Sequence, residues 1–277
     1  MNNTAIRTFS GIFFVGIMLA GFLIHPYLFA ALHIFIIVCM MHEFYNMSIG
    51  PKRFMTPRIL GMAMALCEFI TAFLIFGYQH APRLMVLTVI PLLVALMISI
   101  LYVKDKSGFR DMAFIFFGVF YIGPPVAAAN ALVFGPEGEF SGFVLLGFFL
   151  VIWASDVGAY VFGHLFDEHG KKLFPSVSPK KSWAGFWGGL VLAVIAGVII
   201  YFTGWFKLNL VYCIIISVVM DVAGVYGDLF ESQWKRTFGY KDSGNIIPGH
   251  GGMLDRFDSA LFAIPAGLGC LLLMRML

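Results

Sequence analysis

The sequence predicts an all-α fold, in the form of a polytopic integral membrane protein with about nine transmembrane helices. Hydrophobic residues make up 60% of the 277 residues, charged residues make up only 12%, and the mean hydropathy is +0.91. These values lie far outside the range of soluble globular chains. Apolar runs of about 20 residues, the length that crosses a hydrocarbon core as a helix, recur along the chain and exclude the alternating pattern of a β-barrel.

The apolar runs follow one another closely, and each is expected to form one helix. Only His25 and Pro26 separate the first two runs. In the fifth run, Gly123-Pro124-Pro125 is expected to kink or interrupt the helix, because proline lacks a backbone donor and clashes with the preceding turn. The expected spans are residues 6–24, 27–47, 58–77, 84–103, 111–134, 142–163, 183–203, 208–231 and 254–274.

The basic residues indicate the orientation of these spans. Of the 18 Lys and Arg residues, all but Arg83, Lys207 and Arg275 fall in the same set of alternate loops. Lys and Arg are enriched in cytoplasmic loops, so we expect the N-terminus in the cytoplasm and the C-terminus outside. The first run continues past a typical signal-peptide core, which favours a retained helix.

The chain shows no internal repeat or long linker, so residues 1–277 are expected to form a single membrane domain. Its N-terminal helical part, residues 1–140, has short basic loops. The catalytic helical part, residues 141–277, contains most of the intramembrane acids and two cytoplasmic loops, residues 164–182 and 232–253. The compact chain without a long hydrophilic extension is typical of a bacterial inner (plasma) membrane protein whose functional site faces the cytoplasm.

Two simple features exclude other classes of function. The cysteines sit singly inside expected spans, without the paired spacing of a zinc site or a disulfide framework, and are interpreted as packing residues. The net charge of +3 is explained by membrane topology, so no nucleic-acid partner is expected. The cysteines are Cys39, Cys67, Cys213 and Cys270.

A polar stretch, residues 232–258, interrupts the hydrophobic sequence near its end. Basic groups can clamp phosphoryl oxygens, carboxylates can hold a divalent cation, and glycines let backbone N–H groups approach a polyanion. The stretch therefore indicates an enzyme that acts on phosphorylated substrates. Its charged residues are Lys235, Arg236, Lys241, Asp242, Asp255, Arg256 and Asp258.

Acidic residues also occur inside the expected spans. Asp221, Asp228, Glu231 and Lys235 recur at helical spacing in the eighth span and therefore share one face. A carboxylate at the centre of a bilayer costs about 2.5–3.5 kcal/mol, so these groups need partners or water. An interhelical ion-pair seam and a functional site are both compatible with this pattern, and Asp221, the deeper residue, suits the seam better than Asp228 does.

Three acids on separate helices are expected at one cytoplasmic depth. Asp156 lies near the inner end of the sixth span, Asp228 at the inner end of the eighth and Asp255 at the inner start of the ninth. Mg²⁺ commonly takes one or two carboxylates together with water and substrate phosphates. We therefore prefer the hypothesis of a shared Mg²⁺ site to that of three unrelated charges at the membrane surface.

Two loop segments have the composition of phosphate-binding elements. Ser178-Pro179-Lys180-Lys181-Ser182 directly precedes the seventh span, where a helix N-terminus favours anions, although lysines are ordinary in cytoplasmic loops. The glycine-rich residues 248–252, which include His250, Gly251 and Gly252, could wrap a phosphate. By contrast, the acids and histidines of the first spans are interpreted as inward polar packing: His33, His42, Glu43 and Glu68.

The order of these motifs resembles the signature of the phosphatidate cytidylyltransferase (CDP-diacylglycerol synthase) family. The resemblance covers residues 153–259 and departs from the family pattern at Ala184 and His164. The matching elements are Asp156-Val157-Gly158-Ala159-Tyr160, Ser178-Pro179-Lys180-Lys181-Ser182-Trp183, Gly227-Asp228, Ser232, Lys235-Arg236, Lys241-Asp242-Ser243-Gly244, Pro248-Gly249-His250-Gly251-Gly252 and Leu254-Asp255-Arg256-Phe257-Asp258-Ser259.

The resemblance implies that CTP and phosphatidic acid condense to CDP-diacylglycerol and pyrophosphate in a lipid bilayer, with Mg²⁺ as cofactor and a second metal or a monovalent cation left open. It implies metal ligation by Asp228 and Asp255, with Asp156 or Glu231 in support, and it also implies a homodimer. Phosphoryl oxygens would be bound by Lys235, Arg236, Lys241 and Arg256, with His250 as a positioning residue. Ser178, Lys180, Lys181 and Ser182 would form the opposite wall of the nucleotide site.

Two alternatives stay open. A cation-coupled membrane transporter also carries intramembrane acids, but clustering at one membrane face argues against it. A cytidylyltransferase for another lipid phosphate shares the same motifs. Substrate competition would distinguish that enzyme from one that uses phosphatidic acid.

Overall fold

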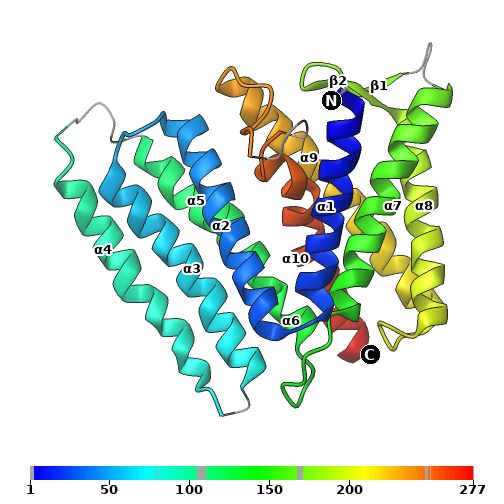
Figure 1. The fold of residues 1–277 in the computed structure, drawn as a ribbon, viewed down its shortest axis with the longest axis horizontal. Coiled ribbons are helices and arrows are strands. Elements are labelled where there is room, and N and C mark those ends of the chain that lie inside the picture. Colours follow the sequence, from blue (N-terminus) through cyan, green and yellow to red (C-terminus); the bar gives the residue numbers. More distant parts are fainter. Residues whose placement is uncertain are drawn as a thin grey trace. The chain divides into compact units, whose positions relative to one another are not determined.

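The computed structural model describes residues 3–78, 80–104, 109, 111–166, 171–246, 249 and 251–276, with side chains described from residue 9 onward. Within these residues the chain is almost entirely helical, which confirms the all-α prediction (Figure 1). Eight helical segments among the described residues are long and apolar enough to cross a membrane. The part of the first helix whose side chains are described, Phe9–Leu23, is a shorter apolar helix. Together they correspond to the nine expected runs of an integral membrane protein.

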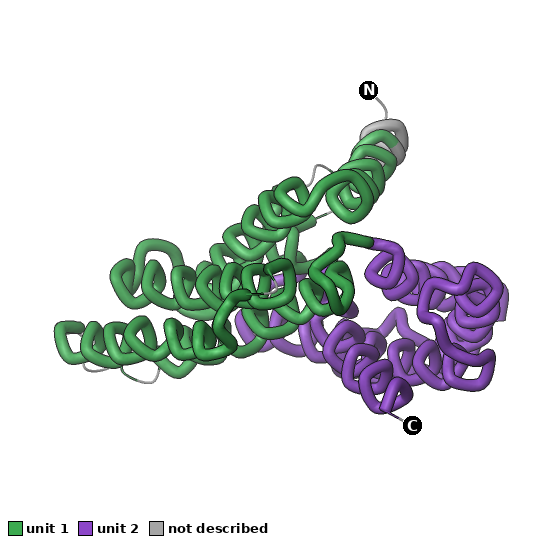
Figure 2. The backbone as a smooth tube through the Cα atoms, turned by 90° about the horizontal axis from the view of Figure 1, so that it is seen from below, with its two compact units in different colours: residues 1–141, 242–256 green, residues 142–241, 257–277 purple. Residues whose placement is uncertain are grey.

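The chain forms two compact units (Figure 2). Unit 1 contains residues 1–141 and 242–256, and unit 2 contains residues 142–241 and 257–277. The last helix therefore begins in unit 1 and continues in unit 2.

Unit 1 contains the first helices and a separate later segment. Helix α2 contacts α1, α3 and α5, and α3 also contacts α4 (Figure 1). Large aromatic side chains, among them Phe44, Tyr45 and Phe69, fill its core. Its elements are α1 (Asn3–Leu23), α2 (Pro26–Ile49), α3 (Met55–Gly77), the 3-10 helix η1 (Arg83–Thr88), α4 (Val89–Leu101), α5 (Met112–Ala128) and α6 (Asn130–Val133).

The proline pair of the fifth run lies inside α5. The helix is not interrupted at these prolines. It continues to Ala128, and the short α6 follows from Asn130. Tyr45 Oη on α2 donates to the carbonyl of Ile115 on α5 at 3.0 Å and helps to hold the two helices together.

Unit 2 is built from α7 (Phe143–Phe166), α8 (Trp183–Thr203), α9 (Leu210–Thr237) and α10 (Leu254–Met276), with a two-stranded hairpin of β1 (Lys172–Phe174) and β2 (Ser178–Ser182). Helices α7, α8 and α9 contact one another, and the hairpin contacts α8 and α9. Helix α10 joins them through ring contacts of Phe257 with Phe149 on α7 and of Phe262 with Phe230 on α9.

Two expected loops are more ordered than the sequence suggested. The segment 164–182 contains the antiparallel hairpin, with a bulge between its pairs Lys172–Ser182 and Phe174–Ser178. Helix α9 continues to Thr237, past the expected end at residue 231, so Ser232, Lys235 and Arg236 lie on a helix and not in a loop.

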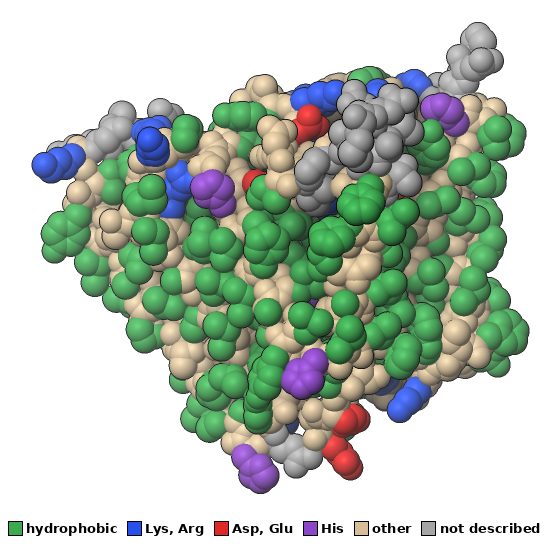
Figure 3. Space-filling view, viewed as in Figure 1, with side chains coloured by type: hydrophobic (Ala, Val, Ile, Leu, Met, Phe, Trp, Pro, Cys, Tyr) green, Lys and Arg blue, Asp and Glu red, His purple; other side chains and the backbone are tan. Residues whose placement is uncertain are grey.

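Hydrophobic side chains cover most of the face shown in Figure 3, with charged groups toward the ends of the helices. This is the surface expected where lipid replaces water as the solvent of the helices.

Candidate active site

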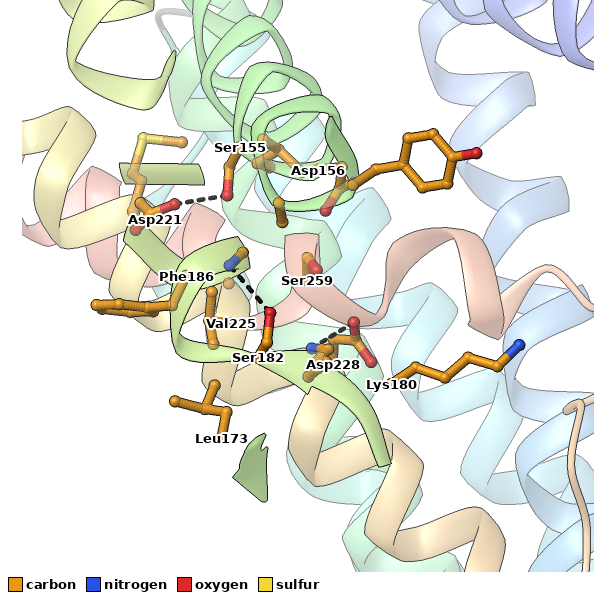
Figure 4. A pocket seen from close by; sticks show the side chains of 17 residues that line it. Ser155, Asp156, Leu173, Lys180, Ser182, Phe186, Asp221, Val225, Asp228 and Ser259 are labelled. Carbon is orange, nitrogen blue, oxygen red and sulfur yellow. Dashed lines mark hydrogen bonds and ion pairs between the residues drawn. The ribbon is translucent and has the colours of Figure 1, made fainter. Parts of the chain in front are cut away.

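A cavity of about 240 Å³ lies within unit 2 (Figure 4). Its inner wall is mostly apolar, and its polar side chains come from four different elements. This combination suits a ligand with both apolar and charged parts. The polar residues are Ser155 and Asp156 on α7, Lys180, Lys181 and Ser182 on β2, Asp221 and Asp228 on α9, and Ser259 on α10.

Asp228 and Lys181 form an ion pair on the cavity wall, with Lys181 Nζ 2.5 Å from Asp228 Oδ2. Ser232 Oγ, one helical turn further along α9, donates to Asp228 Oδ1 at 3.2 Å. The side chains of Asp228 and Lys181 are 31% and 25% exposed, so both remain accessible from the cavity. A carboxylate and an ammonium side by side can engage a metal ion and a phosphoryl oxygen respectively.

Asp221 lies two helical turns deeper along α9 and is 2% exposed. Ser155 Oγ on α7 donates to Asp221 Oδ1 at 2.5 Å, and no hydrogen-bond partner of Asp221 Oδ2 is found among the described residues. The hydrogen-bond partner of Asp221 is thus the hydroxyl group of Ser155 on the neighbouring helix. Within the described residues, Asp221 does not take part in the interhelical ion pairs that the sequence analysis considered.

Asp258 on α10 interacts electrostatically with Asp156, Asp228 and Glu231. Its Oδ1 accepts a hydrogen bond from the backbone N–H of Ser259 at 2.6 Å. Sequence reasoning did not select Asp258 as a site residue, although its place three residues after Asp255 puts it in the same first turns of α10. These four acids, from three helices of unit 2, are therefore near enough for the charge of Asp258 to interact with the other three.

Glu231 and Lys235, two predicted site residues, pair with each other on α9. Their charged atoms are 2.6 Å apart, and their side chains are only 1% and 10% exposed. Neither is among the described residues that line the cavity. In this structure Lys235 neutralises a buried carboxylate and does not present its charge to the cavity.

The other predicted basic residues of this segment lie at the surface. Arg236 donates to the backbone carbonyl of Tyr240 at 3.0 Å, and Lys241 and Arg256 are exposed. His250, predicted as a positioning residue, lies outside the described residues.

The hairpin supplies the predicted serines and lysines of the nucleotide wall. Lys180, Lys181 and Ser182 line the cavity, whereas Ser178 begins strand β2 outside the described lining. Ser182 is also the N-cap of α8, because its Oγ accepts a hydrogen bond from the backbone N–H of Gly185 at 3.1 Å. A serine N-cap satisfies one of the free N–H groups at a helix start, so Ser182 fixes where the hairpin joins α8.

Asp255 and the glycines before it belong to unit 1. Asp255 Oδ2 accepts hydrogen bonds from the backbone N–H groups of Gly252 at 2.8 Å and Ser243 at 2.9 Å. Gly251 has φ +84°, and a Cβ there would lie 2.6 Å from Asp255 Oδ2. Gly251 and Gly252 therefore lie against a carboxylate of the protein itself, a contact that the predicted phosphate-binding role did not anticipate.

The chemistry of the donors fits Mg²⁺, although no three Asp, Glu, His or Cys side chains in the described part of the chain lie close enough to hold an ion alone. Mg²⁺ prefers oxygen ligands and commonly completes its coordination with water and substrate phosphates. Asp156 and Asp228 line the same cavity and can supply carboxylate oxygens of this kind.

Comparisons with known proteins agree with the chemistry of the site. The sequence profile of the cytidylyltransferase family matches residues 5–273. A phosphatidate cytidylyltransferase of Staphylococcus haemolyticus is 40% identical over 162 residues, which cover 58% of this chain and 60% of the relative. Proteins of the same name from Staphylococcus saprophyticus and Staphylococcus aureus are 40% and 39% identical, with the same shares of both chains covered. The matched region thus spans about 60% of the length of these curated relatives.

Proposed function

This chain belongs to the cytidylyltransferase family, and we propose that it is a phosphatidate cytidylyltransferase, which condenses CTP with phosphatidic acid to CDP-diacylglycerol and pyrophosphate. The observation that carries the proposal is the cavity of unit 2, where Asp156, Asp228 and Lys181 meet beside apolar helices. Phosphatidic acid brings acyl chains and a phosphate, and CTP brings a triphosphate, so both need charged groups at a membrane-embedded site.

In the proposed reaction, a phosphate oxygen of phosphatidic acid attacks the α-phosphorus of CTP. The new P–O bond forms as the bond between the α-phosphorus and its bridging oxygen to the β-phosphorus breaks, and pyrophosphate leaves with that oxygen. A phosphate monoester is already ionised near neutral pH, so the chain need not supply a base. Its task is to orient two anions and to screen their repulsion.

Lys181 is placed for this task because it already pairs with a carboxylate on the cavity wall. When phosphates enter, its ammonium can exchange Asp228 for phosphoryl oxygens without leaving the site. Lys180, exposed on the same strand, also lines the cavity and carries a second positive charge. The phosphate-binding roles of Arg236, Lys241 and Arg256 rest on the resemblance alone.

We propose Mg²⁺ as the cofactor, held in unit 2 by Asp228 with Asp156, while the metal roles of Asp255 and Glu231 rest on the resemblance alone. When bound, Mg²⁺ neutralises charge on the triphosphate and on the departing pyrophosphate. The support from this chain is the carboxylate and hydroxyl oxygens among the cavity residues and the electrostatic interaction of Asp258 with Asp156 and Asp228.

The apolar helices place the enzyme in a membrane, and its relatives are bacterial. We place it in the inner membrane with its site toward the cytoplasm, because CTP is cytoplasmic and the basic loops share one predicted side. The association into a homodimer is supported by the resemblance alone.

The proposal is tested with purified full-length protein, labelled CTP, phosphatidic acid and Mg²⁺, following both the lipid product and pyrophosphate. Asp228→Asn removes the charge of the cavity carboxylate and is expected to lower turnover by about 100-fold or more. Asp111→Asn is the matched control, because Asp111 pairs with Arg53 at the surface of unit 1 and should change turnover by less than about twofold.

Two results would refute the proposal. One is a folded wild-type protein that forms no nucleotide-linked lipid from phosphatidic acid. The other is an Asp228→Asn variant with full Mg²⁺-dependent activity, which would refute the role of the cavity.

A further inference from the structure

Glu43 on α2 is a buried carboxylate that the sequence interpretation treated as packing. Its side chain is 4% exposed. Oε1 accepts a hydrogen bond from the backbone N–H of Met253 at 2.9 Å, and Oε2 accepts one from the backbone N–H of Leu254 at 2.8 Å. Ser243 Oγ donates a third, also to Oε2, at 2.9 Å. All three donors lie in the segment 242–256 of the same unit, about 200 residues further along the chain.

The contacts of Glu43 are made at the start of α10. The first N–H groups of a helix have no partner within the helix, and a buried helix start needs acceptors from elsewhere. Glu43 supplies two of them, at Met253 and Leu254, and its negative charge is favoured at the positive end of the helix dipole. A side chain from a distant helix thus caps α10.

The Glu43 carboxylate packs directly against the backbone of two glycines. A Cβ on Gly244 would lie 2.5 Å from Glu43 Oε1, and a Cβ on Gly252 would overlap Glu43 Oε2 and Ser243 Oγ. Two of the signature glycines are therefore required by the close approach of Glu43. Glycine is needed at these two positions because of a contact within the protein, independently of any bound phosphate.

The same donors and acceptors reach Asp255. Ser243, which donates its hydroxyl hydrogen to Glu43, donates its backbone N–H to Asp255 Oδ2 at 2.9 Å and accepts the backbone N–H of Asp255 at 3.3 Å. Gly252, packed against Glu43, also donates its N–H to Asp255 Oδ2. Two of the hydrogen bonds to the Asp255 carboxylate thus come from Ser243, which Glu43 binds, and from Gly252, which packs against Glu43.

We propose that Glu43 is a positioning residue of the enzyme, which fixes the first turn of α10 and thereby the carboxylate of Asp255. The inference rests on the proposed function, and on the metal role that the resemblance gives to Asp255, for its kinetic consequence. It rests on the hydrogen-bond network alone for its structural consequence. Glu43 acts through Ser243 and Gly252 and need not touch substrate.

The experiment compares full-length wild-type protein with Glu43→Gln and Ser243→Ala in lipid nanodiscs. Gln has nearly the shape of Glu but places an NH₂ group against backbone donors, so one of the three hydrogen bonds must be lost. Ser243→Ala removes a smaller part of the same network and serves if Glu43→Gln does not fold. Glu68→Gln is the matched control, since Glu68 lies on α3 against Gly123 of α5, outside this network.

Two readouts separate positioning from general stability. Hydrogen exchange of the amides of Met253 and Leu254 is expected to be faster by about tenfold or more in Glu43→Gln, because Glu43 is their acceptor. The Mg²⁺ concentration for half-maximal turnover is expected to rise and kcat to fall by about tenfold to 100-fold, as for other groups that orient metal ligands. Ser243→Ala should shift both in the same direction and less, and Glu68→Gln should shift neither.

The outcomes are distinguishable. If the wild-type protein lacks transferase activity, the proposed function fails, and hydrogen exchange still decides whether Glu43 holds the segment. If the wild-type protein is active and Glu43→Gln keeps the wild-type exchange and Mg²⁺ dependence, the positioning role is refuted. A fall in activity equal to that of Glu68→Gln, with unchanged Mg²⁺ dependence, also refutes it.

Discussion

The ion pair between Lys181 and Asp228 gives the cavity both of the charges that its proposed chemistry needs. Lys181 lies on β2 and Asp228 on α9, so the pair also ties the hairpin to the helix that carries the acids. Partly exposed pairs contribute little to stability because water screens them. The value of this pair therefore lies in the charges it keeps available to a ligand.

Removal of the Lys181 charge should weaken nucleotide binding more than it weakens the fold. In Lys181→Gln we expect the KM for CTP to rise by about tenfold, because a charge-assisted contact to phosphate is lost, with little change in unfolding temperature. Steady-state kinetics with varied CTP measure this. Lys52→Gln, an exposed lysine of unit 1, is the control and should leave KM unchanged. An unaltered KM in Lys181→Gln would place the triphosphate elsewhere.

Glu43 shows what sequence reasoning could not supply at the level of single residues. An isolated acid near the end of an apolar run is compatible with packing, and its partners Ser243, Met253 and Leu254 lie about 200 residues away. No spacing rule connects such positions. Asp156, Asp228 and Lys181, by contrast, were identified from charge in apolar surroundings and from the motif order, and the structure gathers them on one cavity wall.

The helices were predictable where hydrophobicity alone decides them. The ninth run was expected to begin at residue 254, where α10 begins, because a glycine-rich segment ends there. The end of α9 was placed too early, at residue 231, because the polar stretch that follows was interpreted as a loop, although the helical spacing of Glu231 and Lys235 was recognised. In the structure they are four residues apart on one helix face and neutralise each other, so the helix continues to Thr237.

Close helix packing in unit 2 depends on glycines whose packing role the sequence analysis did not predict. A Cβ on Gly158 of α7 would overlap the carbonyl oxygen of Gly188 on α8, and a Cβ on Gly188 would overlap Phe162 Cβ. Membrane helices approach closely where small residues face each other, because packing and not water expulsion drives their association. These contacts hold α7, which carries Asp156, close to α8, which follows the hairpin.

Gly188→Ala should therefore destabilise the protein. The added methyl group meets backbone and Cβ atoms that cannot turn away, and overpacking of this kind costs about 1–3 kcal/mol. Thermal unfolding in detergent measures the loss as a lower midpoint. Gly269→Ala on α10 is the control, because a Cβ there meets nothing within 4 Å. Equal midpoints for the two variants would show that α7 and α8 are less tightly packed than described.

For the chain as a whole, the signature motifs are divided between the two units. Residues 242–256, with Asp255, belong to unit 1, whereas Asp228 and Asp258 belong to unit 2. Residues 242–256 belong to unit 1 because the contacts of Glu43 join them to α2. The N-terminal helices, which the sequence analysis treated as a non-catalytic part, thus hold a portion of the signature in place.

The basic residues of both units favour one membrane orientation. In unit 1, Lys52 lies between α2 and α3, and Lys104 follows α4 at the same end of these helices. In unit 2, the lysines of the hairpin precede α8, and Lys207 lies beyond its other end. Retention of Lys and Arg on the cytoplasmic side then puts Lys52 inside and Lys207 outside.

Single-cysteine labelling tests this orientation. The four native cysteines lie in helices and are replaced by alanine, and Lys52→Cys and Lys207→Cys are introduced separately. In intact cells a membrane-impermeant maleimide is expected to label only the Lys207→Cys variant, and permeabilisation should add labelling of the Lys52→Cys variant. The reverse pattern would place the lysine-bearing hairpin, and the cavity beside it, outside the cell. CTP, which is made in the cytoplasm, could then not reach the site, so the experiment bears on the proposed function as well as on the fold.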